Sequence, residues 1–159
     1  MIELLVVVVV LGVLVSALVL SIGGSSDRAL ELQARRLQGL LQLACEQAEL
    51  TGRDVGVFMS ADGVGFAWRG PDRWYPLTEA AREPLRTRAL EPGIEMTLER
   101  DDETLRLPSE RPEAPQLVCL SSGELTPFLL RFARADVTRR WLLRGAMDAR
   151  LDVEAEDAR

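Results

Sequence analysis

The chain has 159 residues, a net charge of -6 at pH 7, 47% hydrophobic residues and no histidine. The sequence also contains no lysine and no asparagine. Without imidazole or ammonium groups there is no Ser-His or Cys-His nucleophile pair, no histidine metal ligand, no Walker A loop and no Schiff-base lysine. The composition therefore argues against an enzyme, and the lack of an evident basic face argues against a nucleic-acid-binding protein.

The first 22 residues contain one acid, Glu3, followed by an unbroken apolar run over 4–15. As a helix, residues 2–22 would be about 31 Å long, close to the hydrocarbon thickness of a bilayer. No basic residue precedes this run, so a cleaved signal peptide is not expected. We predict a transmembrane helix over 1–22. A carboxylate in such a segment is costly unless a partner neutralises it, although a plain anchor with Glu3 at the water interface stays open.

A second helical segment follows the Gly23-Gly24-Ser25-Ser26 sequence. Ser26 or Asp27 can cap a helix that runs to about Thr51, and Gly52 is a natural stop. The apolar residues at helical spacing are Leu30, Leu37, Leu40, Leu41, Ala44, Cys45 and Ala48. Residues 23–51 are therefore predicted to be an amphipathic continuation of the first helix, either in one long spine or after a hinge at Gly23-Gly24.

From residue 52 the hydrophobic period changes to two, which predicts strands. A hairpin is expected around Asp62-Gly63, then a turn at 70–72, a helical turn at 78–83 ended by Pro84, and a proline-rich loop over 108–115. The expected strands are 55–59, 64–68, 74–77, 94–98, 104–107, 117–120, 127–133, 139–144 and 150–153. The fold class is α+β, in which residues 52–159 form a small antiparallel β domain of about seven to nine strands packed on the helix.

The two cysteines allow two interpretations. A disulfide between Cys45 and Cys119 would close a loop of about 75 residues and stabilise the fold by roughly 4 kcal/mol in an oxidising compartment. However, Cys45 lies on the apolar stripe of the helix and Cys119 in a predicted strand, and free cysteine behaves as a small buried hydrophobe. We favour two buried thiols.

Several other polar groups and one aromatic residue are candidates for catalysis, calcium binding or partner contact. Ser121-Ser122-Gly123 is predicted to be a turn with glycine at positive φ, because no base is available to activate either serine. Asp62 and the acids at 101–103 could bind calcium, but solvated turns are expected, so no metal or other cofactor is predicted. Trp74, beside two prolines, is a candidate for contact with a partner protein.

Three stretches of the sequence carry a family resemblance. Ile2-Glu3-Leu4-Leu5-Val6-Val7 resembles the start of mature type IV pilins and type II secretion pseudopilins, which begin Phe-Thr-Leu-Ile-Glu-Leu; Met1 stands where the family usually has leucine. The stretches 37–52 and 120–128 resemble the minor pseudopilin H family of type II secretion. The resemblance spans nearly the whole chain and implies a pilin-like fold and a non-enzymatic subunit of the pseudopilus, taking part in tip assembly and in export of folded proteins across the outer membrane.

The resemblance also implies partners and site residues. Glu3 would meet the N-terminal amine of a neighbouring subunit during assembly, while Gly12 and Ala17 would allow close packing of transmembrane helices. The partners would be the major and the other minor pseudopilins. The inner membrane would hold the helix as a single pass, with the globular domain in the periplasm and no nucleic acid bound.

The start of the chain departs from the family pattern. Family precursors carry a short basic leader ending in glycine, which the prepilin peptidase removes before it methylates the new N-terminus. No leader precedes Glu3 here, so we expect it upstream of Met1. Two alternatives remain: a minor pilin of a type IV pilus, concerned with adhesion, motility or DNA uptake, and a single-pass anchored periplasmic protein of another role.

Overall fold

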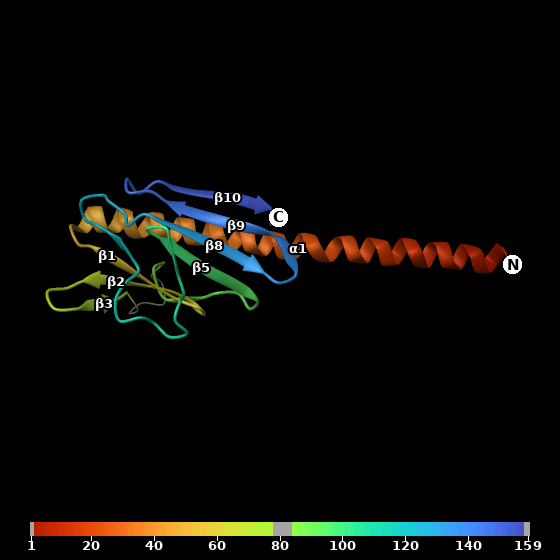
Figure 1. Cartoon of the computed structure of the whole chain (residues 1–159), viewed down its shortest axis with the longest axis horizontal. Coiled ribbons are helices and arrows are strands. Elements are labelled where there is room, and N and C mark those ends of the chain that lie inside the picture. Colours follow the sequence, from red (N-terminus) through yellow and green to blue (C-terminus); the bar gives the residue numbers. More distant parts are fainter. Residues whose placement is uncertain (1, 78–83, 158–159) are drawn as a thin grey trace.

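A single long helix organises the whole molecule (Figure 1). The computed structural model describes residues 2–77 and 84–157, apart from the side chains of residues 2, 4, 5 and 14–25. Helix α1 (Ile2–Thr51) is continuous. Of the two alternatives, the single spine is confirmed. A hinge at Gly23-Gly24 and a new helix capped at Ser26 or Asp27 are both wrong, because the helix runs through these positions.

The helix ends where the sequence predicts. Gly52 has φ +65, the left-handed conformation that glycine adopts at a helix C-terminus. The Gly52 N–H donates to the carbonyl of Glu49 at 3.4 Å, and the Arg53 N–H donates to the carbonyl of Ala48 at 3.2 Å. This pair of bonds is a Schellman motif, which satisfies two carbonyls of the last turn and releases the chain into the first strand.

The first sheet follows directly. It consists of β1 (Val55–Ser60), β2 (Gly63–Arg69), β3 (Trp74–Pro76), β4 (Arg88–Ala89) and β7 (Leu117–Cys119). Its order is β3-β2-β1-β7, with β4 also paired to β2. Ser60 pairs with Gly63, which confirms the predicted hairpin around Asp62-Gly63. Strand β4 was not predicted, and the helical turn expected at 78–83 lies outside the described residues.

The second sheet contains the remaining strands. They are β5 (Ile94–Arg100), β6 (Glu103–Leu105), β8 (Phe128–Arg134), β9 (Val137–Gly145) and β10 (Leu151–Asp157). The order is β10-β9-β8-β5-β6, and all its pairs are antiparallel, as predicted. Asp101 and Asp102 both have positive φ (53 and 63), so the β5–β6 turn places two aspartates in the conformation that a tight two-residue hairpin needs.

The core lies between the second half of α1 and the two sheets. Helix α1 contacts β8, β9 and β10 of the second sheet and β1 and β7 of the first. Its fully buried stripe consists of Leu30, Ala34, Leu37, Leu41, Ala44, Cys45 and Ala48. This confirms the predicted stripe except at Leu40, which is half-buried, and it adds Ala34. Phe66 and Phe132 are the largest core side chains that are almost completely buried.

The two cysteines are joined. Cys45 and Cys119 form a disulfide with their Cα atoms 4.9 Å apart, so the preference for two buried thiols is wrong. Both cysteines are buried, as expected. The sequence does not reveal that β7 pairs with β1, with Cys119 beside Val55, and that this pairing brings the strand onto the helix at the level of Cys45. The bond ties the end of the helix to the first sheet.

We expect the disulfide to contribute much of the stability of the fold. The bridged residues are 74 apart in the sequence. In the chain-entropy model, replacing both cysteines with serine should lower the free energy of unfolding by about 4 kcal/mol. Urea unfolding of the oxidised protein, the reduced protein and the double variant measures this. If reduction does not shift the unfolding midpoint, the bond is not formed in solution.

The buried stripe also predicts where the chain can be divided. A fragment from Asp27 to Arg159 should fold as a monomer, because its own sheets cover the apolar face of the remaining helix. Analytical ultracentrifugation should give one monomeric species, and circular dichroism should show both helix and sheet. Large aggregates would show that the body needs the first 26 residues to fold.

Candidate functional site

The first half of α1 projects beyond the body and has an apolar surface. Figure 1 shows it as a rod leaving the sheets. The large apolar side chains that are described here are each more than half exposed, from 51% at Val10 to 63% at Val13; they are Val6, Val7, Val8, Val9, Val10, Leu11 and Val13. The exposed residues are consecutive, so they surround the helix rather than form one stripe. Such a surface needs a cover of lipid or other helices.

Among the residues whose side chains are described, no helix is both long enough and apolar enough to cross a bilayer.

The predicted assembly residues lie on this projecting helix. Glu3 is exposed in the first turn, where a carboxylate is favourable with respect to the helix dipole. A Cβ added to Gly12 would meet no neighbouring atom within 4 Å, so packing against the body does not require glycine there. The side chain of Ala17 lies outside the described residues. Glu3, Gly12 and Ala17 are spread along the projecting helix, so the structure does not gather them into one site.

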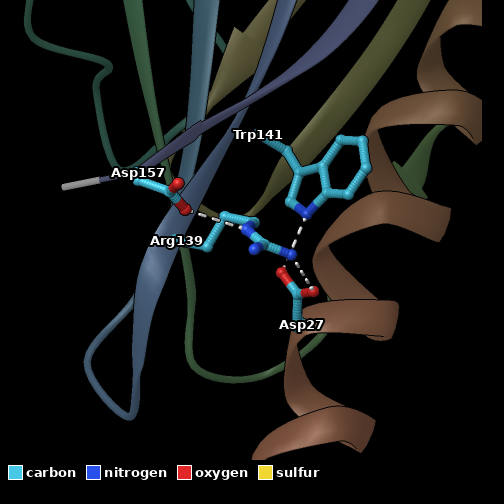
Figure 2. Close-up of polar contacts among 4 residues, drawn as sticks. All are labelled: Asp27, Arg139, Trp141 and Asp157. Atoms are coloured by element: carbon cyan, nitrogen blue, oxygen red, sulfur yellow. Dashed lines mark hydrogen bonds and ion pairs between the residues drawn. The ribbon is translucent and has the colours of Figure 1, made fainter.

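A polar cluster fixes the helix where it enters the body, and the sequence analysis missed it. Figure 2 shows the Asp27 carboxylate meeting two side chains of β9. The indole Nε1–H of Trp141 donates to Asp27 Oδ1 at 3.1 Å, and Arg139 Nη1 donates to Asp27 Oδ2 at 3.2 Å. Arg139 Nε donates to Asp157 of β10 at 3.1 Å. One arginine therefore joins the helix to the C-terminal strand.

A second contact lies one residue earlier on the helix. Ser26, which is 8% exposed, donates its hydroxyl to Asp136 Oδ2 at 2.9 Å. Asp136, in the turn between β8 and β9, also accepts from Arg134 Nε at 2.8 Å. We call Ser26, Asp27, Asp136, Arg139, Trp141 and Asp157 the junction network. Ser26 and Asp27 were predicted as helix caps; instead, their side chains attach the uninterrupted helix to the second sheet.

Charges in the junction network stabilise one another. The hydrogen bond from Ser26, followed by contributions from its own backbone and from Arg134, lowers the pKa of Asp136 below the usual 3.8. The hydrogen bond to Asp157, together with the charges of Asp27 and Asp157, raises the pKa of Arg139. A lowered carboxyl pKa favours folding above about pH 4 and loses that contribution as the pH falls. Asp136 therefore makes this contribution in full near neutral pH.

The other candidate groups do not assemble a reactive site. Ser121 and Ser122 lie in a turn whose Gly123 has φ +90, as predicted. In the described part of the chain, no group of three or more Cys, Asp or Glu residues is arranged to hold a metal ion.

The chain matches a known protein family and named relatives within it. Residues 33–148 match the family model described as "Type II transport protein GspH". The chain is 37% identical over 144 residues to "Type II secretion system protein H" of Pseudomonas aeruginosa, covering 84% of this chain and 80% of the relative. It is 32% identical to the protein of that name from Aeromonas hydrophila, covering 89% of this chain and 83% of the relative.

A solved structure shows the same fold. The minor pseudopilin EpsH of the type 2 secretion system of Vibrio cholerae superposes with a TM-score of 0.62 at 26% identity, covering 79% of this chain and 96% of that structure. This likeness confirms the pilin-like α+β fold. The family match favours type II secretion over the type IV pilus, and it confirms a structural subunit rather than an enzyme. The chain belongs to the GspH family of type II transport proteins, the minor pseudopilin H family.

Proposed function

We propose that this minor pseudopilin is anchored in the inner membrane by residues 1–22 and places its body in the periplasm. It docks through the projecting helix against the major and the other minor pseudopilins and takes part in assembly of the pseudopilus tip. The observation that supports this proposal is the apolar surface around Val6–Val13, which has no cover in the single chain. A helix apolar on all sides can leave lipid only by packing against other helices.

The junction network gives this docking a mechanical consequence. The helix is unbroken between its projecting and buried halves, and Asp27 and Ser26 bond to the second sheet at the point of exit. A subunit that moves by its helix therefore carries its body in a fixed orientation. We propose that this coupling lets the body keep its place in the tip while the filament pushes exoproteins towards the outer membrane.

Glu3 carries the assembly role in this proposal. Its carboxylate would pair with the N-terminal amine of a neighbouring subunit, so that two charges disfavoured by lipid neutralise each other. Gly12 and Ala17 would permit close approach of the neighbouring helix. A basic leader, which the prepilin peptidase would remove before it methylates the new N-terminus, would supply the inward-facing positive charge that orients the body outwards.

The first test replaces Glu3 with leucine. Insertion into the membrane should persist or improve, whereas docking should fall on the order of 100-fold, because an unpaired charge in lipid costs about 3 kcal/mol. The variant is expressed with a functional leader in a type II secretion strain lacking its own H subunit. Membrane level, cross-linking to the other pseudopilins and exoprotein release are measured.

Glu46→Leu is the matched control for Glu3→Leu. Glu46 is exposed on the buried half of the helix, remote from the projecting rod. The Glu46→Leu variant should assemble and support secretion like the unmodified protein. If Glu3→Leu cross-links and secretes at the unmodified level, then Glu3 merely lies at the water interface and the assembly role is lost.

The second test addresses the junction. Asp27→Ala leaves the indole N–H of Trp141, which is 8% exposed, without its acceptor. We expect a loss of about 1–3 kcal/mol in the free energy of unfolding of the full chain in detergent micelles, measured by urea unfolding. Amide hydrogen exchange should rise in β9 near Trp141 and in the helix around Asp27. Asp148→Ala is the control, because Asp148 contacts only Arg150 on the surface, and its unfolding midpoint should not move. Unchanged exchange in Asp27→Ala would contradict the coupling.

A further inference from the structure

The outer face of the first sheet is covered neither by the helix nor by the second sheet; its strand residues are buried instead beneath Trp74, Arg111 and the loop that contains Pro115. Along β1 and β2, alternate residues face the core; these are Val55, Val57, Met59, Val64 and Phe66. Their neighbours face the opposite side, where Phe58 and Gly56 of β1 lie beside Gly65 and Ala67 of β2. Figure 1 shows β2 and β3 on the side of the body away from α1. We call this surface, together with Trp74 of β3, the outer face.

Two glycines of the outer face allow neighbouring side chains to pack directly on the strand backbone. A Cβ at Gly56 would lie 2.8 Å from the Trp74 ring and 2.9 Å from Cβ of Pro115, so the indole packs directly on the backbone of β1. At Gly65 a Cβ would lie 3.1 Å from the hydroxyl of Thr87. The rings of Phe58 and Trp74 meet edge to face, with centroids 6.0 Å apart. Trp74, which the sequence indicated as a candidate for contact with a partner protein, therefore lies on this surface.

Three arginines lie on the rings of this region. The guanidinium of Arg111 lies 4.1 Å from the centroid of Phe58, that of Arg69 lies 5.5 Å from Trp74, and that of Arg73 lies 4.9 Å from Tyr75. Burial lowers the pKa of Arg111. Among the described residues, neither Arg111 nor Arg69 has a carboxylate within ion-pair distance.

Arg111 separates two hollows in this surface. One, of about 210 Å³, is lined mainly by apolar surface, including Phe58, Gly65 and Thr87, with Asp62, Arg88 and Arg111 at its charged positions. The other, of about 360 Å³, is lined by Asp72, Arg73, Trp74, Pro76, Pro112 and Glu113. Two acids line this second hollow, Asp72 and Glu113, and Asp72 accepts a hydrogen bond from Tyr75 at 2.9 Å. An apolar hollow thus lies directly beside a partly desolvated guanidinium.

We propose that the outer face binds an acidic segment of a partner protein. A carboxylate of that segment pairs with Arg111, and an adjacent apolar side chain enters the hollow between Phe58 and Thr87. A guanidinium that stacks on an aromatic ring keeps its N–H edge available for a carboxylate, and desolvation strengthens that pair. Arginine and tryptophan in such settings carry much of the energy of protein interfaces. The surface is remote from the projecting helix, so the proposal goes beyond docking through that helix and does not depend on it.

The test measures peptide binding by the full chain in detergent micelles. The probes are fluorescein-labelled peptides with a central phenylalanine and aspartates one, two or three positions away, each matched by a peptide with asparagine in place of aspartate. At about 150 mM salt, fluorescence anisotropy should show at least one acidic peptide binding about tenfold or more tighter than its amide match.

Two arginine variants then locate the binding. Arg111→Gln should lose about tenfold or more in affinity for the acidic peptide, whereas Arg106→Gln, at an exposed arginine that lines neither hollow, should bind unchanged. Circular dichroism checks that both variants fold. Binding of the acidic peptide is also measured with Arg69→Gln, a second variant on the outer face. Equal binding of acidic and amide peptides, or equal loss in Arg106→Gln, would overturn the proposal. A dimer in sedimentation that Arg111→Gln dissociates would place a second copy of the chain on this face and would overturn the proposal as well.

Discussion

The rest of the structure depends on one constraint: α1 is a single helix that must satisfy two environments. From Leu30 to Ala48 its stripe is buried by the sheets, while Val6–Val13 is exposed on all sides. The helix has no break at Gly23-Gly24, so an orientation imposed on the projecting half is imposed on the body. Two attachments make this coupling firm. Asp27 bonds to β9 where the helix enters the body, and the disulfide of Cys45 holds it about 27 Å further along, given about 1.5 Å per residue.

The two sheets play different parts around this rod. The second sheet packs β8, β9 and β10 along the helix, and the junction network closes its near end. The first sheet meets the helix through β1 and β7 and is tied there covalently at Cys119. Consequently β1 is buried on both sides: its core face lies against the helix stripe, and its outer face lies beneath Trp74 and the loop that contains Pro115. Among the described residues, the arginines that lie over aromatic rings do so on the first sheet and its flanking loops.

Features that depend on local sequence were predictable, whereas features that depend on contacts between distant segments were not. The helix stripe, the hairpin at Asp62-Gly63, the stop at Gly52 and the positive φ at Gly123 follow from periodicity and turn chemistry, and each is confirmed. The disulfide, strand β4 and the junction network depend on which strands become neighbours. Asp27 after a Gly-Ser sequence looks like a helix cap, and only the position of β9 shows that its carboxylate serves Trp141 and Arg139. The roles proposed for Glu3, Gly12 and Ala17 concern contacts with neighbouring subunits rather than contacts within this chain.

The basic residues of this chain are all arginine, and the geometry depends on that choice. Arg139 reaches Asp27 with Nη1 and Asp157 with Nε, so one planar group joins the helix to the C-terminal strand. Lysine would keep the charge, but its single nitrogen cannot reproduce two bonds from opposite edges of a rigid fork. The same planarity lets Arg111 and Arg69 lie against Phe58 and Trp74. The charge of these arginines therefore fixes the direction of elements and shapes a surface, and both sets of contacts use the planar, multi-donor guanidinium.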